Sequence, residues 1–374
     1  MFENNFPPNP NEIEISLLGG KFIGESIVIH LGDNNWGIVD SFNYKGKPAS
    51  IQYLKSMNQD LSNVKFILLT HWHQDHCKGI AETAELCPNA ELWISDCFCS
   101  ASFIYFLELY NDIIPQTKFD SLNHVRRYLD LPRTSKRASQ DKLIHRNESN
   151  NPLEIYALTP SDETKKLMEL HIKKMINKLE SKKISLNEKK VLKLKDENLK
   201  SVALVMKLGS VDIILAGDLE IDEKDRAGIG LSSILDSKVI TKENTIIFKI
   251  PHHGSKTGYD ENIWNQLLSE NPILMLTPYK GGKNVLPTKE MIDTLCDNYS
   301  QIYITSNPHI SFSNTLKHSR SVKKKLKKLG VDKINKIQGE IGHIKIRFDI
   351  NDVSPNISLF GRSEKLCVNT SHKK

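Results

Sequence analysis

The chain has 374 residues, of which 39% are hydrophobic and 26% are charged. This length can bury a large core, and the composition is typical of a folded globular protein rather than a disordered or fibrous one. The net charge of +6 permits a polyanionic partner but does not by itself indicate one.

The N-terminal part of the chain contains short strands followed by alternating strands and helices. Its start, MFENNFPPNPNEIEI, has no signal-peptide features, and the apolar runs along the chain fall short of the roughly 18 residues that a membrane span needs. We therefore expect a cytoplasmic protein with no membrane partner. Apolar runs and turn residues predict strands at 12–18, 25–32 and 36–42, a helix near 48–58, a strand at 65–70, a helix at 79–86 and a strand at 91–95.

A dense group of histidines follows the strand that ends near residue 70. The sequence HWHQDH places His71, His73, Asp75 and His76 within six residues. Three imidazoles and a carboxylate so close together are costly in a core and unnecessary on a surface, so we expect them to bind metal. The first two histidines are two apart in extended chain and can share one ion, whereas the aspartate and the last histidine come where a helix begins and can reach a second position. The spacing therefore predicts two neighbouring metal positions.

The region 98–200 departs from the alternating pattern and is rich in lysine. We expect a single domain spanning 1–374, in which 98–200 is a largely helical insertion and a strand near 153–158 belongs to the core. Apolar residues recur at helical spacing within 162–200, which indicates an amphipathic surface helix. A nucleic-acid-binding arm is the functional alternative for that segment.

Strands resume in the second half of the chain. They are predicted at 201–208, 211–217, 245–250, 273–277, 301–305 and 343–350. Two strand-rich halves, each with helices, indicate two packed sheets with helices outside. The lysine-rich segment SVKKKLKKLG at 321–330 is either a phosphate-binding surface or a terminal amphipathic helix.

The six cysteines show no CxxC pair and no spacing typical of a disulfide framework. In a chain this long, such a pattern predicts reduced thiols rather than disulfides.

The HxHxDH motif after an apolar strand resembles the metallo-β-lactamase fold superfamily. The segments WGIVDSF, IILAGDLE and IFKIPHHGSKTG resemble further motifs of that family and occur in its order. The wording of LTPSDE, NLKSVALVMKLGSVDIILAGDLE and KIPHHGSKTGYDE is similar to the soluble hydrolase domain of ComEC, the DNA-internalisation competence protein, over roughly residues 12–98 and 150–306. The resemblance implies a four-layer αββα sandwich.

The resemblance also implies roles for single residues. Asp40 would orient the ligand loop through hydrogen bonds that fix the tautomer of ligating imidazoles. Asp218, unless it is an ordinary turn residue, would bridge the two metal positions. Of His252 and His253, one would bind metal and the other would face substrate. We favour His252 as the ligand because it is closer to the end of the strand.

In one respect the chain departs from most enzymes of this superfamily, which supply another histidine between the second and fourth motifs. The corresponding strand here offers Asn198 and Ser201, as ComEC-like domains do. The first metal position then keeps His71, His73 and Asp218, and the second keeps Asp75, His76, Asp218 and His252. We expect one or two divalent ions, Zn²⁺ or Mn²⁺. His145 and His171 are alternative ligands, although lone histidines in an insertion are usually surface residues.

These features predict a metal-dependent hydrolase in which the ion activates water. Asp75 or Asp218 would orient that water and accept its proton, and His253 would give a proton to the leaving group. The ComEC-like wording and the basic charge favour a phosphodiester substrate, as in a nuclease or a nucleotide phosphodiesterase. Ser255 and Lys256 would contact its phosphate, or would only form a turn.

Two alternatives stay open at this point. The substrate is another ester, such as a lactone or thioester, although HHGS and the missing histidine argue against a β-lactam. Otherwise the chain is a non-catalytic, metal-binding regulatory subunit whose 98–200 insertion docks a partner protein.

Overall fold

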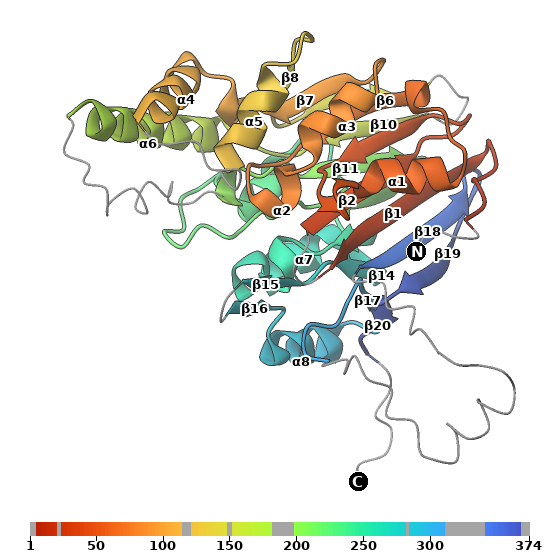
Figure 1. Ribbon diagram of the computed structural model, residues 1–374. Coiled ribbons are helices and arrows are strands. Elements are labelled where there is room, and N and C mark those ends of the chain that lie inside the picture. Colours follow the sequence, from red (N-terminus) through yellow and green to blue (C-terminus); the bar gives the residue numbers. More distant parts are fainter. Residues whose placement is uncertain are drawn as a thin grey trace, which may run out of the picture.

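Two packed β-sheets form the centre of the molecule, and helices lie on their outer faces (Figure 1). The computed structural model describes residues 5–20, 24–113, 121–147, 152–181, 198–281, 284–310 and 341–367.

The first sheet has the strand order β19-β18-β1-β2-β3-β6-β7-β8. Its strands are β1 (Glu12–Gly20), β2 (Gly24–His30), β3 (Trp36–Val39), β6 (Val64–Leu69), β7 (Glu91–Ser95), β8 (Lys136–Ala138), β18 (Gly342–Asp349) and β19 (Asp352–Gly361). The strands from β3 to β8 run parallel, so the loops after β3 and β6 leave the sheet at the same edge.

The second sheet has the order β20-β17-β14-β13-β12-β11-β10-β9. Its strands are β9 (Lys142–Arg146), β10 (Leu153–Ala157), β11 (Leu204–Leu208), β12 (Val211–Leu215), β13 (Thr245–Lys249), β14 (Leu268–Leu276), β17 (Ile302–Ile304) and β20 (Glu364–Lys365). Because β12, β13 and β14 are parallel neighbours, the loops after them also meet at one edge. Two small hairpins pair β4 (Asn43–Tyr44) with β5 (Lys47–Pro48) and β15 (Tyr279–Gly281) with β16 (Asn284–Leu286).

Three apolar layers hold the fold together. The helices are α1 (Ala49–Ser56), α2 (Gln74–Cys77), α3 (Ile80–Leu86), α4 (Ala101–Ile113), α5 (Ser121–Leu129), α6 (Asp162–Glu180), α7 (Glu261–Leu267) and α8 (Lys289–Asn298). One cluster of buried side chains joins the first sheet to helices from α1 to α6, a second fills the space between the sheets, and a third joins the second sheet to α7 and α8. The predicted four-layer αββα sandwich is therefore confirmed.

The region 98–200 is less helical than we predicted. It contains α4, α5 and α6, but β8 and β9 also form the edges of the two sheets, and β10 is the predicted core strand. The short strands β8 and β9 escaped prediction because their sequences, KRA and KLIHR, are charged and lack an apolar run. The predicted helix within 162–200 is described as far as Glu180, and both 182–197 and the lysine-rich 321–330 lie outside the described residues.

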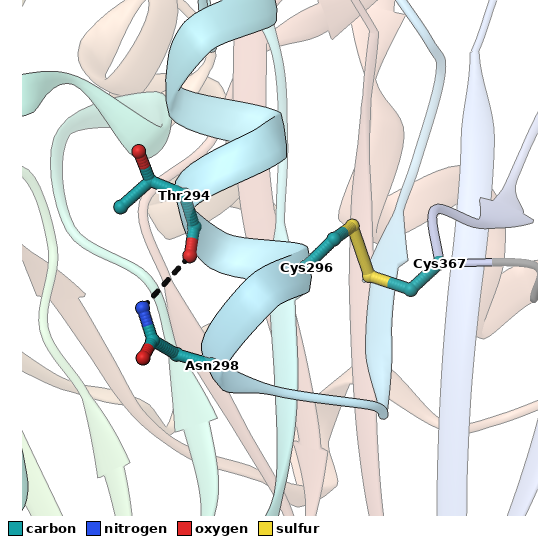
Figure 2. The surroundings of a disulfide bond; sticks show 4 residues. All are labelled: Thr294, Cys296, Asn298 and Cys367. Carbon is teal, nitrogen blue, oxygen red and sulfur yellow. Dashed lines mark hydrogen bonds between the residues drawn. A yellow bond between two sulfur atoms is a disulfide. The ribbon is translucent and has the colours of Figure 1, made fainter.

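A disulfide bond contradicts the prediction that all six cysteines are reduced. Cys296 in α8 is bonded to Cys367 after β20, with 5.5 Å between their Cα atoms (Figure 2). The other four cysteines, Cys77, Cys87, Cys97 and Cys99, are free thiols. The sequence does not reveal the pair because its members are 71 residues apart and only the fold brings them together.

Among the helices that the structure describes, none has the length and apolar character needed to cross a membrane.

Candidate metal centre

The histidine-rich motif follows β6 directly and turns into the short helix α2. His73, the residue before this helix, has extended backbone angles (φ −64°, ψ 145°), whereas Asp75 and His76 lie inside the helix. The predicted change from extended chain to helix within the motif is therefore present. It lets the side chains of the motif approach one region from different directions.

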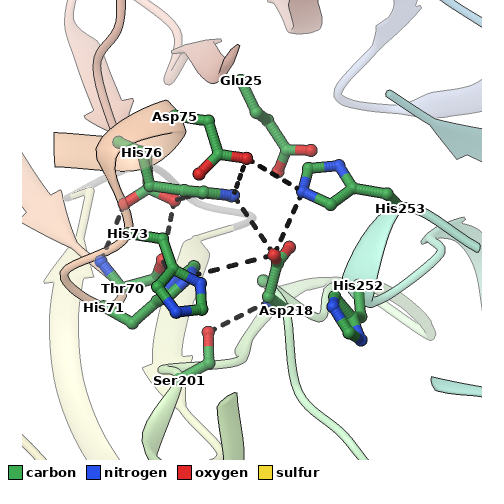
Figure 3. Close-up of polar contacts among 12 residues, drawn as sticks. Glu25, Thr70, His71, His73, Asp75, His76, Ser201, Asp218, His252 and His253 are labelled. Atoms are coloured by element: carbon green, nitrogen blue, oxygen red, sulfur yellow. Dashed lines mark hydrogen bonds and ion pairs between the residues drawn. The ribbon is translucent and has the colours of Figure 1, made fainter. Parts of the chain in front are cut away.

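Side chains from two separate parts of the chain, the histidine motif and His253, converge on the buried carboxylate of Asp218 (Figure 3). Its Oδ2 lies 3.8 Å from Nε2 of His71 and 3.4 Å from Nε2 of His76. The same oxygen lies 3.1 Å from Nε2 of His253, which is also 3.1 Å from Oδ2 of Asp75. Potential ligand atoms lie within 4.8 Å of one another in four overlapping groups of described residues. Two of them are His71 with His73 and Asp218, and Asp75 with His76 and His253; the others add Asp40 to His71 and His76, and Glu25 to Asp218 and His253.

The local backbone explains how Asp218 reaches this place. Gly217, just after β12, has φ +52°, and a Cβ atom there would lie 2.5 Å from Oγ of Ser201. Only glycine fits such a close approach in a left-handed conformation. The backbone N–H of Asp218 donates to the same Ser201 hydroxyl at 3.0 Å, which fixes the direction in which the carboxylate points.

Asp40 sets the tautomers of two histidines. It is almost fully buried, and it accepts hydrogen bonds from the backbone N–H and the hydroxyl of Thr70 at 2.8 and 2.7 Å. Because that hydroxyl proton is used, Thr70 must accept from Nδ1–H of His71 at 2.9 Å. Nδ1–H of His76 donates directly to Asp40 at 2.7 Å. Both imidazoles therefore direct Nε2 toward Asp218, the orientation that a ligating histidine needs.

The structure reverses the expected roles of His252 and His253. Nδ1 of His253 lies 3.2 Å from the carbonyl of Thr277, so its Nε2 faces the two carboxylates. His252 points away (Figure 3), and its Nδ1 lies 2.7 Å from Glu220 and 3.1 Å from Thr257. The preference for His252 as the ligand was wrong, and His253 occupies that position.

Backbone conformation accounts for this reversal. His252 and His253 both have positive φ values, 46° and 53°. Two left-handed residues in succession turn the chain sharply, so the histidine nearer the strand end is carried past the carboxylates and the next one faces them. Such conformations are uncommon for residues other than glycine, and nothing in the letters HH predicts them.

Two further buried charges, Lys249 and Glu25, lie beside Asp218, and the sequence analysis did not identify either. Nζ of Lys249 contacts Oε1 of Glu25 and the carbonyl of Gly217, each at 2.7 Å, and lies 3.5 Å from Oδ1 of Asp218. Thr277, which holds His253, donates its hydroxyl to Glu25. Lys249 ends an apolar strand, TIIFK, and a charge in such a place was the available signal.

Charges in the cluster shift one another's protonation strongly. Burial would lower the pKa of His76 and of His253, but the carboxylates of Asp218 and its neighbours outweigh it, and the pKa of His253 rises to about 9. Burial would raise the pKa of Asp75 and Asp218, but these two imidazoles lower it. The pKa of His71 falls because of burial and its two histidine neighbours. Protons on two imidazoles thus supply the positive charge that the carboxylates require.

The donor set fits a divalent cation. Nε2 of His76 and Oδ1 of Asp218 are both buried, and neither has a hydrogen-bond partner among the residues that the structure describes. Nitrogen and carboxylate ligands of this kind suit Zn²⁺ or Mn²⁺, whose charge would replace the imidazole protons.

The remaining residues singled out in the sequence lie around the cluster or far from it. Ser201 supports Asp218, so a serine stands where the additional histidine was missing. His145 lies in β9 against Phe66, with 5.9 Å between ring centres, and His171 lies in α6. Neither belongs to a group of potential ligands among the described residues.

Ser255 and Lys256 follow the two histidines closely. The Ser255 hydroxyl accepts from the backbone N–H of Thr257 at 3.3 Å and so begins a short 3₁₀ turn, whereas Lys256 is exposed. A further residue of this surface, Tyr279 in β15, stacks on His253 with 5.5 Å between ring centres and is 37% exposed. Nothing in the sequence around Tyr279 had indicated this position.

The family model of the Metallo-beta-lactamase superfamily matches residues 19–96, which include β2 to β7 and the histidine motif. No curated protein sequence matches the chain.

Several solved metallo-β-lactamase structures are similar to the chain. MIM-2 is 16% identical over 53% of this chain and 59% of its own, with a TM-score of 0.28. MEM-A1, a subclass B3 enzyme from a soil metagenome library, is 13% identical over 80% of both chains, with a TM-score of 0.31. SMB-1 bound to 2-mercaptoethanesulfonate is 15% identical over 70% of this chain and 90% of its own, with a TM-score of 0.34. The chain thus spans about three fifths of the length of MIM-2.

Proposed function

We propose that the protein is a metal-dependent hydrolase of phosphodiesters, acting on a nucleic acid or a nucleotide. The observation that carries the proposal is the convergence of three Nε2 atoms, from His71, His76 and His253, on the carboxylates of Asp75 and Asp218. A divalent ion held there would lower the pKa of a water molecule and neutralise charge on the attacked phosphate.

The chain's own residues then have separate tasks. Asp218 is buried and fixed by Lys249, so it serves to hold the ion or ions in place. Asp75 is more accessible, with 19% of its side chain exposed, and its lowered pKa keeps it ionised, so it can accept a hydrogen bond from the attacking water. His252 is the histidine left to face substrate. We expect it, rather than His253, to meet the leaving group.

Four features support a phosphodiester as the substrate. The motifs around Asp218 and the HHGS segment resemble the hydrolase domain of ComEC, and the chain carries a net charge of +6. Lys256 is exposed next to the cluster and offers a cation to a phosphate oxygen. The exposed ring of Tyr279, stacked on His253, offers a flat surface to a base.

The test is hydrolysis of a chromogenic phosphodiester by protein loaded with Mn²⁺ or Zn²⁺, with a lactone as the comparison substrate. Wild-type protein should cleave the phosphodiester and leave the lactone intact. Asp75→Ala should abolish cleavage, while Asp130→Ala, which removes an exposed carboxylate paired with Arg126 on the surface, should not change it. Cleavage of the lactone alone would assign a different ester. A folded, metal-loaded protein without activity on either would indicate a regulatory subunit.

A further inference from the structure

Basic side chains gather near the beginning of β6, the strand whose other end leads to the metal cluster. A cleft of about 940 Å³ opens between β8 and β9, the edge strands of the two sheets. Its walls also include the beginning of β6 and part of β7. The cleft contains none of the residues of the metal centre.

The walls of this cleft are strongly basic. Five cationic side chains line it, against the single carboxylate of Glu91: Lys65, Lys136, Arg137, Lys142 and Arg146. Three of the five have acidic partners, because Lys136 pairs with Glu91, Arg137 lies 3.9 Å from Asp96 and Arg146 lies 3.3 Å from Glu154. Lys65 and Lys142 form no ion pair with any described residue. The cleft therefore keeps uncompensated positive charge on two facing elements.

Hydrogen-bond donors in the cleft also lack acceptors. Trp93 is 3% exposed and lines the cleft, yet its indole Nε1–H makes no hydrogen bond to a described residue. The Ser135 hydroxyl, in the same wall, makes none either. An unpaired buried donor costs free energy, so it indicates a missing acceptor. Unpaired donors beside uncompensated cations point to an anion with several oxygens.

The distance to the metal cluster indicates the size of that anion. Lys65 precedes His71 by six residues of mostly extended chain, which at about 3.3 Å per residue places the cleft roughly 20 Å from the cluster. A mononucleotide or cyclic dinucleotide cannot reach both places, whereas a polymer can. The cleft volume is that of a small-ligand pocket, which accommodates a short stretch of single strand rather than a duplex.

We propose that the cleft between β8 and β9 binds the phosphodiester backbone of a single-stranded nucleic acid. The inference extends the proposed function, in that it makes the substrate of the metal centre a polymer. Lysines on edge strands also prevent the sheets of different molecules from pairing. The test below distinguishes this simpler role from nucleic-acid binding.

The test measures fluorescence anisotropy of a labelled single-stranded oligonucleotide of about 16 nucleotides, the upper end of site sizes on such surfaces. Binding is measured in chelator, so that it does not depend on metal or on cleavage. Lys65→Glu combined with Lys142→Glu should weaken binding at least tenfold and reduce the salt slope by about 1 for each lysine. The milder pair Lys65→Gln and Lys142→Gln, chosen in case charge reversal unfolds β6, should act in the same direction.

The matched control makes the same change of charge elsewhere. Lys224→Glu combined with Lys289→Glu alters two exposed lysines outside the cleft and should leave the affinity within about twofold. Equal weakening by cleft and control variants, or unchanged binding in both cleft variants, would overturn the proposal. Self-association of the cleft variants with unchanged binding would assign the lysines to edge protection. Full competition by a cyclic dinucleotide, or equal affinity for a duplex, would refute the single-strand assignment.

Failure of this inference and failure of the proposed function are distinguishable. If the cleft variants lose the oligonucleotide but still cleave a small chromogenic phosphodiester, both proposals stand. If wild-type protein cleaves no phosphodiester yet the cleft variants lose binding, the cleft stands and the proposed hydrolase does not.

Discussion

The two adjacent histidines at the end of β13 have different surroundings, and this difference is directly testable. His253 Nε2 lies 3.1 Å from both Asp75 and Asp218, whereas His252 is paired with Glu220. Removal of one ligand of a small set should weaken metal binding by at least tenfold, because the remaining donors no longer complete the coordination.

His253→Ala should therefore lower the affinity for Zn²⁺ or Mn²⁺ at least tenfold, measured by competition with a chromophoric chelator. His252→Ala is the matched control and should bind metal with an affinity within about threefold of wild type, because it leaves every atom of the cluster in place. A larger loss of metal affinity in His252→Ala than in His253→Ala would instead support His252 as the ligand, as the sequence had favoured.

Lys249 is a fully buried cation between two buried carboxylates, Glu25 and Asp218. Burial would lower its pKa, but the two carboxylates raise it, so the ammonium stays charged. Lys249→Met should lower the free energy of unfolding by about 3–5 kcal/mol, because it leaves Glu25 buried without a counter-charge.

Urea denaturation of the metal-free protein measures this effect. Lys249→Met combined with Glu25→Leu should recover part of the loss, since the orphaned carboxylate is gone. Lys173→Met, which removes an exposed i,i+4 pair with Glu169, should cost less than about 1 kcal/mol. If Lys249→Met and Lys173→Met lowered the free energy of unfolding equally, the buried ion pair would contribute no more to stability than the exposed one.

Among the elements of the fold, the disulfide ties α8 to the segment after β20. It closes a loop in which the two cysteines are 71 residues apart. Cys296→Ser should lower the free energy of unfolding by roughly 4 kcal/mol, because the unfolded chain regains the entropy that the crosslink removed.

Thiol counting under denaturing conditions provides the measurement. Without reductant, four cysteines should react with an alkylating agent, and six after reduction. In the native protein, burial raises the pKa of Cys87 and of Cys97 to about 12, so these two thiols should react slowly. Six reactive thiols in oxidised, denatured protein would be incompatible with the bond.

Sequence patterns predicted the central strands well and the edge strands poorly. β2, β6, β12 and β13 were found because each carries a run of apolar residues that the two packed sheets bury, and β1 was found because apolar residues recur along it. β8, β9 and β19 were not found, because edge strands expose one side and tolerate charged residues, proline and serine. The basic cleft lies between two of these edges, so sequence reasoning could not have reached it.

The candidate site was predicted as far as contiguous motifs extend. His71, His73, Asp75 and His76 were indicated by the spacing of the motif and Asp218 by the family resemblance, and the structure brings them together. Glu25 and Lys249 were missed because a single charged residue in a strand becomes informative only when its partner, distant in sequence, is known. The His252 and His253 assignment failed for another reason, namely that left-handed backbone angles are set by the surrounding fold.

For the molecule as a whole, two buried histidines outside the cluster contribute to the response to acid. Burial lowers the pKa of His343 well below its usual value, and burial also lowers that of His30. Both take up protons more readily when unfolded, with the ordinary pKa near 6.5. Their contribution to stability is complete above pH 6.5 and is lost as the pH falls below it.

The free energy of unfolding, measured with urea from pH 8 to pH 5, should therefore decrease below pH 6.5. His343→Gln cannot bind this proton and should show a shallower decrease than wild type, even if its stability at pH 8 is lower. Identical slopes for the two proteins would mean that His343 does not contribute to the acid response.

The central claim is that one buried cluster binds a divalent ion and uses it to cleave phosphodiesters. The most direct measurement is a titration of metal-free protein with Mn²⁺ or Zn²⁺ in which bound metal and phosphodiester cleavage are recorded together. Cleavage should rise in step with one or two ions bound per chain, and Asp218→Asn should lose both. Metal binding that is unchanged in Asp218→Asn, or cleavage that persists in excess chelator, would contradict the claim.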